Sequence, residues 1–181
     1  MIAQPGLDAQ PLHSATIGSP VGQLTVIASR AGLRAVLWPD DDVARVPDIA
    51  RLDPESAVPA AVREIIDEAT RQLAEYFDGT RTDFDVPLDP VGTEFQQEAW
   101  SALRKIPFGE TLSYGEQAAR MGDRNKARAV GAANGRNPIS IIVPCHRVVG
   151  SNGSLTGFAG GVDAKRFLLD HERQVSGRSL L

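Results

Sequence analysis

Three predicted helices follow one another closely between residues 93 and 135, and their start and stop signals constrain the fold more than any other feature. Two of them open with a capping box, in which a Ser or Thr is followed three residues later by Glu or Gln. Short helices joined by a tight turn form the helix-turn-helix arrangement used on DNA, although many helical hairpins bind nothing. The signals predict helices from Thr93 to about Lys105, from Ser113 to Gly122 and from about Asn125 to Asn134.

The third predicted helix carries almost no bulk. Ala127, Ala129 and Gly131 have small side chains, Val130 is large and apolar, and Arg128 projects from among them. Small residues let a backbone approach another surface closely. A helix packed tightly against a neighbouring helix would show the same composition, so both interpretations stay open at this point.

The first half of the chain predicts a small antiparallel sheet followed by a helix. Three β-rich runs, separated by Gly, Pro and Ser turns, cover residues 13–17, 23–28 and 33–38. Residues 39–57 indicate a polar loop. Residues 60–77 give the clearest helix, because their apolar side chains recur on one face at a spacing of 3.6 residues.

A short extended segment at residues 84–89 leads into a linker, which places a domain boundary near residue 91. We therefore predict an α/β fold in two domains. Residues 1–91 form a small N-terminal α/β domain, with an antiparallel sheet plus a helix. Residues 92–181 form a mainly α-helical C-terminal domain that contains the helix-turn-helix.

Charge is distributed unevenly along the sequence. The chain has a formal net charge of −4, but the segment from Arg120 to Arg147 has six basic residues and one acid, Asp123. That segment carries +5 and the remaining chain −9. Such a charge distribution is typical of a protein that binds phosphates with one basic surface, while its remaining acidic surface repels them. A solvated basic helix face is the alternative.

The composition excludes several other classes of protein. A single cysteine cannot form an internal disulfide, and with three histidines it leaves little for a zinc site, so we predict no metal and no cofactor. No apolar stretch approaches the roughly 18 residues of a membrane span. Residues 1–8 lack the basic start and apolar core of a secretory signal. We predict a cytoplasmic protein with no membrane partner.

The lone cysteine, Cys145, has unusual neighbours. An apolar run and Pro144 precede it, and His146 and Arg147 follow it. A nearby positive charge lowers the pKa of a thiol and favours the reactive thiolate. A buried, inert cysteine is the other reading, and residue chemistry alone leaves the choice open.

Several short motifs follow one another over residues 84–173. They are Ser113–Gly115, Arg128–Gly131, Asn137–Pro138, Pro144–Arg147 with Val148–Gly150, Gly157–Gly161 and Leu168–Glu172. With these motifs the chain resembles the O6-alkylguanine-DNA alkyltransferases, the methylated-DNA–protein-cysteine methyltransferases. The N-terminal half fits the family's variable domain only in outline, and it lacks the cysteines and histidines that hold zinc in some members.

The resemblance implies a single-turnover repair reaction. Cys145 would accept the alkyl group from O6-methylguanine in double-stranded DNA and, less efficiently, from O4-methylthymine. His146 would act as a base through a water, oriented by Glu172. Tyr114 would donate its hydroxyl to the guanine as the base leaves. We interpret Arg147 as a structural ion-pair partner.

The resemblance also implies how DNA is bound. The low-bulk helix would enter the minor groove, and Arg128 would fill the stack vacated by the flipped base. The protein would act as a monomer. Asn137 would tie the helix to the active-site strand, and Phe158 stands where most members carry tyrosine. The expected DNA-binding residues are Tyr114, Arg124, Lys126, Ala127, Arg128, Ala129, Gly131 and Ser151, and the expected pocket residues are Asn137, Val148, Phe158 and Ala159.

Three other functions deserve comparison with this one. A cysteine hydrolase would also need Cys and His, but adjacency of the two in sequence is atypical. A helix-turn-helix regulator explains the helices but not the residues Pro144–Arg147. A lesion-binding sensor without transfer would replace the acceptor cysteine, and Cys145 is present.

Overall fold

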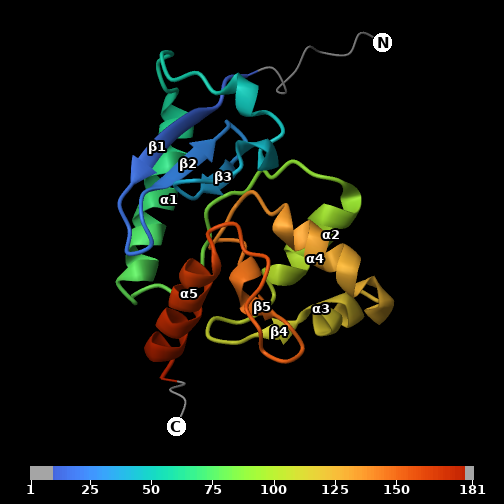
Figure 1. Cartoon of the computed structure of the whole chain (residues 1–181). Coiled ribbons are helices and arrows are strands. Elements are labelled where there is room, and N and C mark those ends of the chain that lie inside the picture. Colours follow the sequence, from blue (N-terminus) through green and yellow to red (C-terminus); the bar gives the residue numbers. More distant parts are fainter. Residues whose placement is uncertain (1–9, 178–181) are drawn as a thin grey trace, which may run out of the picture.

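The computed structural model describes residues 10–177. Residues 1–9 and 178–181 are outside this range, so the expectation about the N-terminal leader falls outside the described residues. We call residues 10–91 the N-terminal part and residues 92–177 the C-terminal part. Figure 1 shows the N-terminal sheet and its helix on one side and the helices of residues 94–135 on the other, while the last helix, residues 162–175, lies on the side of the sheet.

The N-terminal part contains the predicted antiparallel sheet and helix. The strands β1 (His13–Ile17), β2 (Leu24–Ala28) and β3 (Leu33–Leu37) pair in the order β1-β2-β3. The helix α1 (Ala60–Phe77) packs against this sheet, and its buried face has the predicted 3.6-residue spacing. The fold class predicted from the sequence is therefore confirmed for this part.

The segment between β3 and α1 is less exposed than a polar loop. It contains two short 3-10 turns, Val43–Arg45 and Ile49–Arg51. Arg45 is buried with Val46, although neighbouring Asp40, Asp42 and Val43 are exposed. The segment packs because Arg45 donates to the Asn137 carbonyl in the C-terminal part, a contact that the sequence of the segment does not reveal.

The C-terminal part is mainly helical, as predicted. Both capping boxes form, at the starts of α2 (Glu94–Leu103) and α3 (Tyr114–Arg120). The third helix, α4 (Ala127–Gly135), begins about two residues later than predicted because Arg124–Lys126 form a 3-10 turn capped by Asp123. A short parallel pair, β4 (Leu112–Ser113) with β5 (Val148–Val149), joins the helices to the cysteine segment.

The last helix, α5 (Val162–Val175), was not predicted as a helix from its periodicity. Its buried face consists of Lys165, Leu168, Leu169 and Glu172, at the spacing expected of a helix. Two of these four side chains are charged, so the apolar pattern is broken where the helix meets the core.

One hydrophobic core runs through both parts of the chain. It joins β2, β3 and α1 to α2, α5 and the segment before the cysteine. The outer edge of β3 is covered as well, because the Val36 N–H donates to the Pro138 carbonyl at 3.0 Å and the Leu33 N–H to the Pro87 carbonyl at 2.8 Å. The proposed boundary near residue 91 stays a prediction, since this core crosses it.

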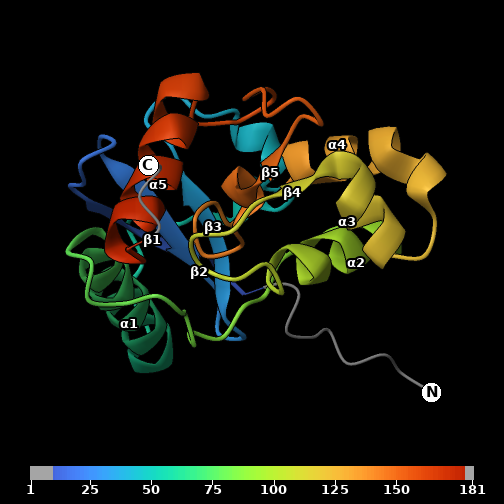
Figure 2. The same cartoon turned by 90° about the horizontal axis from the view of Figure 1, so that it is seen from below.

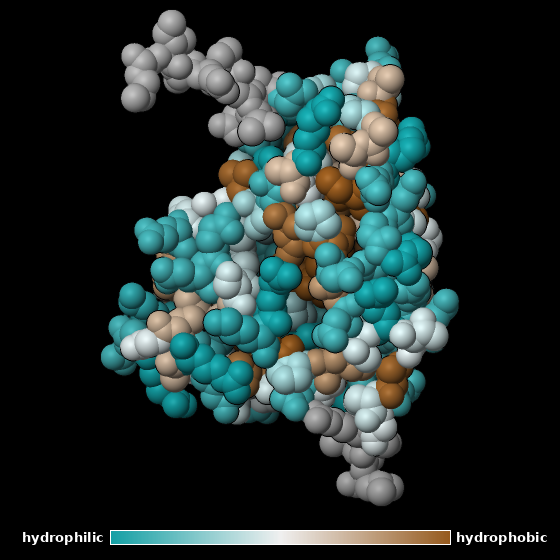
Figure 3. All heavy atoms as spheres, turned by 180° about the vertical axis from the view of Figure 1, so that it is seen from behind, coloured by the Kyte–Doolittle hydropathy of each residue, from teal (hydrophilic) through white to brown (hydrophobic). Residues whose placement is uncertain are grey.

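The two parts remain distinct in outline despite the shared core. Seen from below, α2, α3 and α4 gather on one side, and α1 with the sheet lies on the other (Figure 2). The back of the molecule is largely hydrophilic, with apolar atoms showing mainly in its middle (Figure 3). Among residues 10–177, no helix is long and apolar enough to cross a membrane.

Candidate active site

The cysteine follows a tight turn that Asn137 holds at both ends. The Asn137 side chain accepts a hydrogen bond from the Ile139 N–H at 3.0 Å and donates one to the Val143 carbonyl at 2.8 Å. Within this turn Ile141 has a φ of 74°, a left-handed conformation that is rare for a β-branched residue. Such strain persists only where surrounding contacts enforce it. The turn therefore fixes the backbone that leads to Cys145.

Glu172 lies at the buried centre of the site. Its Oε1 accepts from His146 Nε2 at 2.7 Å, from the Tyr76 hydroxyl at 2.9 Å and from Arg147 Nη2 at 3.0 Å. Its Oε2 accepts from Arg147 Nε at 2.9 Å and from the Gly109 N–H at 3.1 Å. Burial alone would raise the pKa of Glu172, but His146 and Arg147 outweigh it and hold the pKa well below its ordinary value. The carboxylate is therefore ionised.

His146 is held by this carboxylate through one ring nitrogen. Burial lowers the pKa of His146 despite the opposing charge of Glu172, so the imidazole is neutral at pH 7. A carboxylate can only accept, so Nε2 must carry the ring proton, and Nδ1 keeps a free lone pair. His146 Nδ1 is buried and has no hydrogen-bond partner within residues 10–177. This unpaired acceptor belongs to the residue that follows the thiol.

The side chains that lower the pKa of the Cys145 thiol are not its neighbours in sequence. Burial raises the pKa of the Cys145 thiol, so it is not a thiolate in the resting protein. The opposing influences come from the Asn137 side chain and from the positive charges of Arg45 and Lys165, not from the neighbours in sequence. His146 is neutral and Arg147 is paired with Glu172, which explains why they fail to act as the predicted local cations.

Lys165 holds two segments of the site together. It is 1% exposed, and its Nζ donates to the carbonyls of Val148 at 2.6 Å and Thr156 at 3.2 Å. Val148 lies in β5 and Thr156 in the loop between β5 and α5. Burial lowers the pKa of Lys165, against the opposing effect of Cys145. One ammonium group thus ties the strand beyond the cysteine to the following loop.

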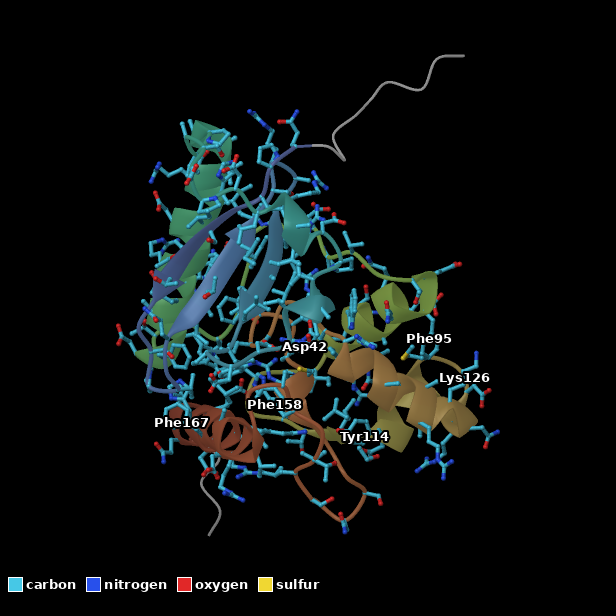
Figure 4. The ribbon with its side chains drawn as sticks, turned by 45° about the horizontal axis from the view of Figure 1, so that its top comes forward. Asp42, Phe95, Tyr114, Lys126, Phe158 and Phe167 are labelled. Atoms are coloured by element: carbon cyan, nitrogen blue, oxygen red, sulfur yellow. The ribbon has the colours of Figure 1, made fainter. Side chains whose placement is uncertain are left out.

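That loop carries two of the four predicted pocket residues. Phe158 is half-buried and Ala159 is exposed. Tyr114, the first residue of α3, donates its hydroxyl to the Thr156 carbonyl at 3.3 Å, and burial raises the pKa of that hydroxyl. Figure 4 shows Phe158 below the N-terminal sheet, between Phe167 and Tyr114 in this view. The loop thus contacts Tyr114 through Thr156, whereas the other two predicted pocket residues, Asn137 and Val148, lie in the turn before the cysteine and in β5.

The helix α4 packs against α2 on one face and leaves another face exposed, so its small residues are consistent with both interpretations. Val130 and Ala133 are buried, and the Ala133 carbonyl accepts a hydrogen bond from Trp100 Nε1 at 2.8 Å. Arg128 and Ala129 are exposed on another face. Among the other predicted DNA-binding residues, Arg124, Lys126 and Ser151 are exposed, and Ala127 and Gly131 are partly exposed. Lys126 lies over the Phe95 ring at 5.8 Å, as Figure 4 allows the reader to follow.

Four side chains of the site were missed by sequence reasoning: Trp38, Arg45, Tyr76 and Lys165. Three of them come from the N-terminal part, in which the sequence predicted no site residue. Arg45 donates to the Asn137 carbonyl and pairs with Asp41. A charged residue in an otherwise apolar helical face is a usable signal for Lys165, but nothing local marks the other three.

The fold and the site define a cysteine-nucleophile protein built from an α/β part and a helix-turn-helix part. Two family models match it. The model described as "6-O-methylguanine DNA methyltransferase, ribonuclease-like domain" covers residues 12–90, and the one described as "6-O-methylguanine DNA methyltransferase, DNA binding domain" covers residues 94–174. The chain belongs to the 6-O-methylguanine DNA methyltransferase family.

Similar proteins cover nearly the whole chain. The methylated-DNA–protein-cysteine methyltransferase of Methanosarcina acetivorans is 46% identical over 162 residues, which are 89% of this chain and 98% of that protein. The crystal structure of the Mycobacterium tuberculosis O6-methylguanine methyltransferase covers 90% of this chain and 93% of its own, with 44% identity and a TM-score of 0.75. A structure of the M. tuberculosis protein in complex with DNA reaches a TM-score of 0.79 at 45% identity, covering 90% and 94% of the two chains.

Proposed function

We propose that this protein repairs DNA by moving the alkyl group of O6-methylguanine onto Cys145, once per chain, with O4-methylthymine as a weaker substrate. The observation that carries the proposal is the neutral His146, whose Nδ1 is unpaired while Nε2 is held by Glu172 at 2.7 Å. This geometry supplies the base that the thiol, with its raised pKa, requires. The relatives named as methylated-DNA–protein-cysteine methyltransferases support the same reaction.

In this reaction His146 Nδ1 takes the proton of Cys145 through a bridging water. The thiolate attacks the methyl carbon, an S–C bond forms, and the bond from that carbon to guanine O6 breaks. The electron pair of that bond goes to the guanine, which takes up a proton from water and stays in the DNA strand as the repaired base. The product is a thioether, which has no easy leaving route, so the reaction stops after one turnover.

The pocket residues are proposed to hold the flipped base. Tyr114 would exchange its bond to the Thr156 carbonyl for one to the guanine, where its raised pKa keeps the hydroxyl protonated and able to donate. The Ala159 N–H would donate to guanine O6, and the backbone at Cys145 and Val148 would read the guanine edge. Asn137 would act by holding the turn before the cysteine.

DNA is proposed to lie along the exposed face of α4, in the minor groove, with Arg128 entering the stack. Few side chains rise from this face, and a narrow groove admits little bulk. Contacts with DNA are assigned to the exposed residues Arg124, Lys126, Ala129 and Ser151 and to the partly exposed Ala127 and Gly131. A monomeric state and a cytoplasmic location stay predictions.

The decisive experiment is the intact mass of the protein after incubation with excess O6-methylguanine duplex DNA. We expect a stable gain of one methyl group per chain, located on Cys145, and one equivalent of lesion consumed. A lesion-binding sensor or a helix-turn-helix regulator would bind the duplex without any gain in mass. Consumption of several equivalents per chain would contradict stoichiometric transfer.

Substituting Arg128→Ala should slow repair of the duplex lesion about tenfold or more. Flipping the base out of the duplex costs a few kcal/mol, and a free base does not require this step. The rate with free O6-benzylguanine should change much less. Single-turnover rates with both substrates test this, and equal losses would show that Arg128 serves the fold instead.

Substituting Phe158→Tyr should change the transfer rate by about tenfold or less. The added hydroxyl can contribute one net hydrogen bond, worth about 0.5–1.5 kcal/mol. Wild-type protein should therefore be active with phenylalanine at this position. A wild-type protein that binds lesions but never methylates Cys145, with the tyrosine variant restoring transfer, would overturn this prediction.

A further inference from the structure

We propose that Trp38, a residue of the N-terminal part, determines which alkyl groups the site accepts, because it fixes the position of Phe158 in the pocket wall. The inference rests on the proposed function, since that function places Phe158 beside the flipped base. It gives the N-terminal part a direct share in substrate selection.

Trp38 is anchored from two directions. It follows the last residue of β3 and is 4% exposed. Its indole Nε1 donates to Ser140 Oγ at 3.0 Å, and Ser140 belongs to the turn before the cysteine. Its backbone N–H donates to Asp41 Oδ2 at 3.1 Å. A buried indole with its polar atom satisfied keeps one orientation, so the ring offers a rigid surface.

The pocket loop rests on this surface. The Trp38 and Phe158 rings meet edge to face, with centroids 5.3 Å apart and an interplanar angle of 69°. The backbone of Gly160 lies on the indole as well, since a Cβ added there would come within 2.6 Å of its ring atoms. The loop therefore contacts Trp38 both through the Phe158 ring and through its own backbone.

Phe158 has a second neighbour that is fixed in place. Lys165 Nζ lies 6.0 Å from the centroid of the Phe158 ring, and the same group is tied to the Val148 and Thr156 carbonyls. The position of Phe158 is thus set by contacts with both the indole of Trp38 and the buried ammonium of Lys165. A smaller side chain at residue 38 would test this contact without removing a charge from the site, whereas a substitution of Lys165 would remove one.

The size of residue 38 should therefore control the space available to the alkyl group. A smaller ring at residue 38 lets Phe158 retreat toward the N-terminal part and widens the pocket. Bulky alkyl groups gain from that space, while methyl gains little. The measurable quantity is the ratio of transfer rates for a large and a small alkyl group, in which base extrusion and thiol activation largely cancel.

The experiment compares single-turnover transfer from O6-benzylguanine and O6-methylguanine, both placed in the same duplex. Trp38→Phe should raise the benzyl-to-methyl ratio of rate constants about two- to tenfold, the scale of one aromatic pair. Trp100→Phe is the matched control, because Trp100 is equally buried but donates its Nε1 to the Ala133 carbonyl in α4 and not to the turn before the cysteine. That variant should leave the ratio unchanged.

A second variant tests the same contact from the opposite side. Gly160→Ala drives a methyl group into the indole and should push the loop into the pocket, so the ratio should fall. Combining it with Trp38→Phe should restore the ratio toward the wild-type value. This variant also decides the matter if Trp38→Phe fails to fold.

The outcomes separate this inference from the proposed function. If the wild-type protein transfers neither group, the proposed function fails. If it transfers both, but the ratio stays within the error of wild type in Trp38→Phe, or in Gly160→Ala, then Trp38 supports the fold only and the inference is overturned.

Discussion

Replacing Cys145 with serine should lower methyl transfer by at least about 10³-fold, the scale on which loss of a nucleophile acts. A serine hydroxyl is far less ionised at neutral pH than a thiol, even one whose pKa burial has raised. The substitution changes one atom in a partly buried position, so folding and duplex binding should be retained. Intact mass after incubation with the methylated duplex gives the result directly.

The control for this variant is its affinity for the same duplex. Wild-type protein and Cys145→Ser should bind unreacted lesion DNA equally well, which shows that the loss concerns chemistry. A methyl group gained by the serine variant would sink the assignment of Cys145 as acceptor, whatever residue then carried it.

Replacing Glu172 with glutamine should damage both stability and transfer. The carboxylate accepts five hydrogen bonds, four of them from buried side chains, and an amide nitrogen in its place would face donors such as His146 and Arg147. Breaking a buried pair by removing one partner commonly costs about 3–5 kcal/mol. His146 also loses the contact that fixes its tautomer. Urea unfolding should show the first effect and single-turnover rates the second.

A matched control separates this effect from the loss of any glutamate. Glu75→Gln removes a carboxylate that pairs with Arg71 and Arg81 on the surface of the N-terminal part. Surface pairs contribute little, so its unfolding midpoint and transfer rate should stay near those of wild type. An equally small effect for Glu172→Gln would contradict the role assigned to the buried carboxylate.

The pH dependence of stability follows from the same group. The folded-state pKa of Glu172 is held below its unfolded value, so its contribution to stability is present above about pH 4.3 and is lost as the pH falls. Wild-type protein should therefore lose more stability than Glu172→Gln on acidification below that pH. Parallel acid unfolding curves for the two proteins would contradict this.

The parts of the fold that could be predicted are those determined within a few residues of chain. The capping boxes at Thr93 and Ser113 close on residues three positions away, so the sequence predicts both helix starts correctly. α1 has a continuous apolar face and is predicted for the same reason. α5 carries Lys165 and Glu172 on its buried face, and its charges are explained only by partners far along the chain.

The site shows the same limit more clearly. The motif around Cys145 predicts which residues matter, but the neighbours in sequence do not set the charge state of the thiol. Arg147 is committed to Glu172, 25 positions away, and Trp38 reaches Ser140 across 102 positions. No periodicity or spacing reports contacts of that range.

The turn before the cysteine also has a consequence for solubility. Pro138 and Ile139 cover part of the outer edge of β3, which would otherwise present unpaired backbone groups to other chains. The same few residues therefore prevent the edge strand β3 from pairing with other chains. A variant that loosens this turn should begin to associate through β3 before it unfolds, and its first visible defect should be aggregation.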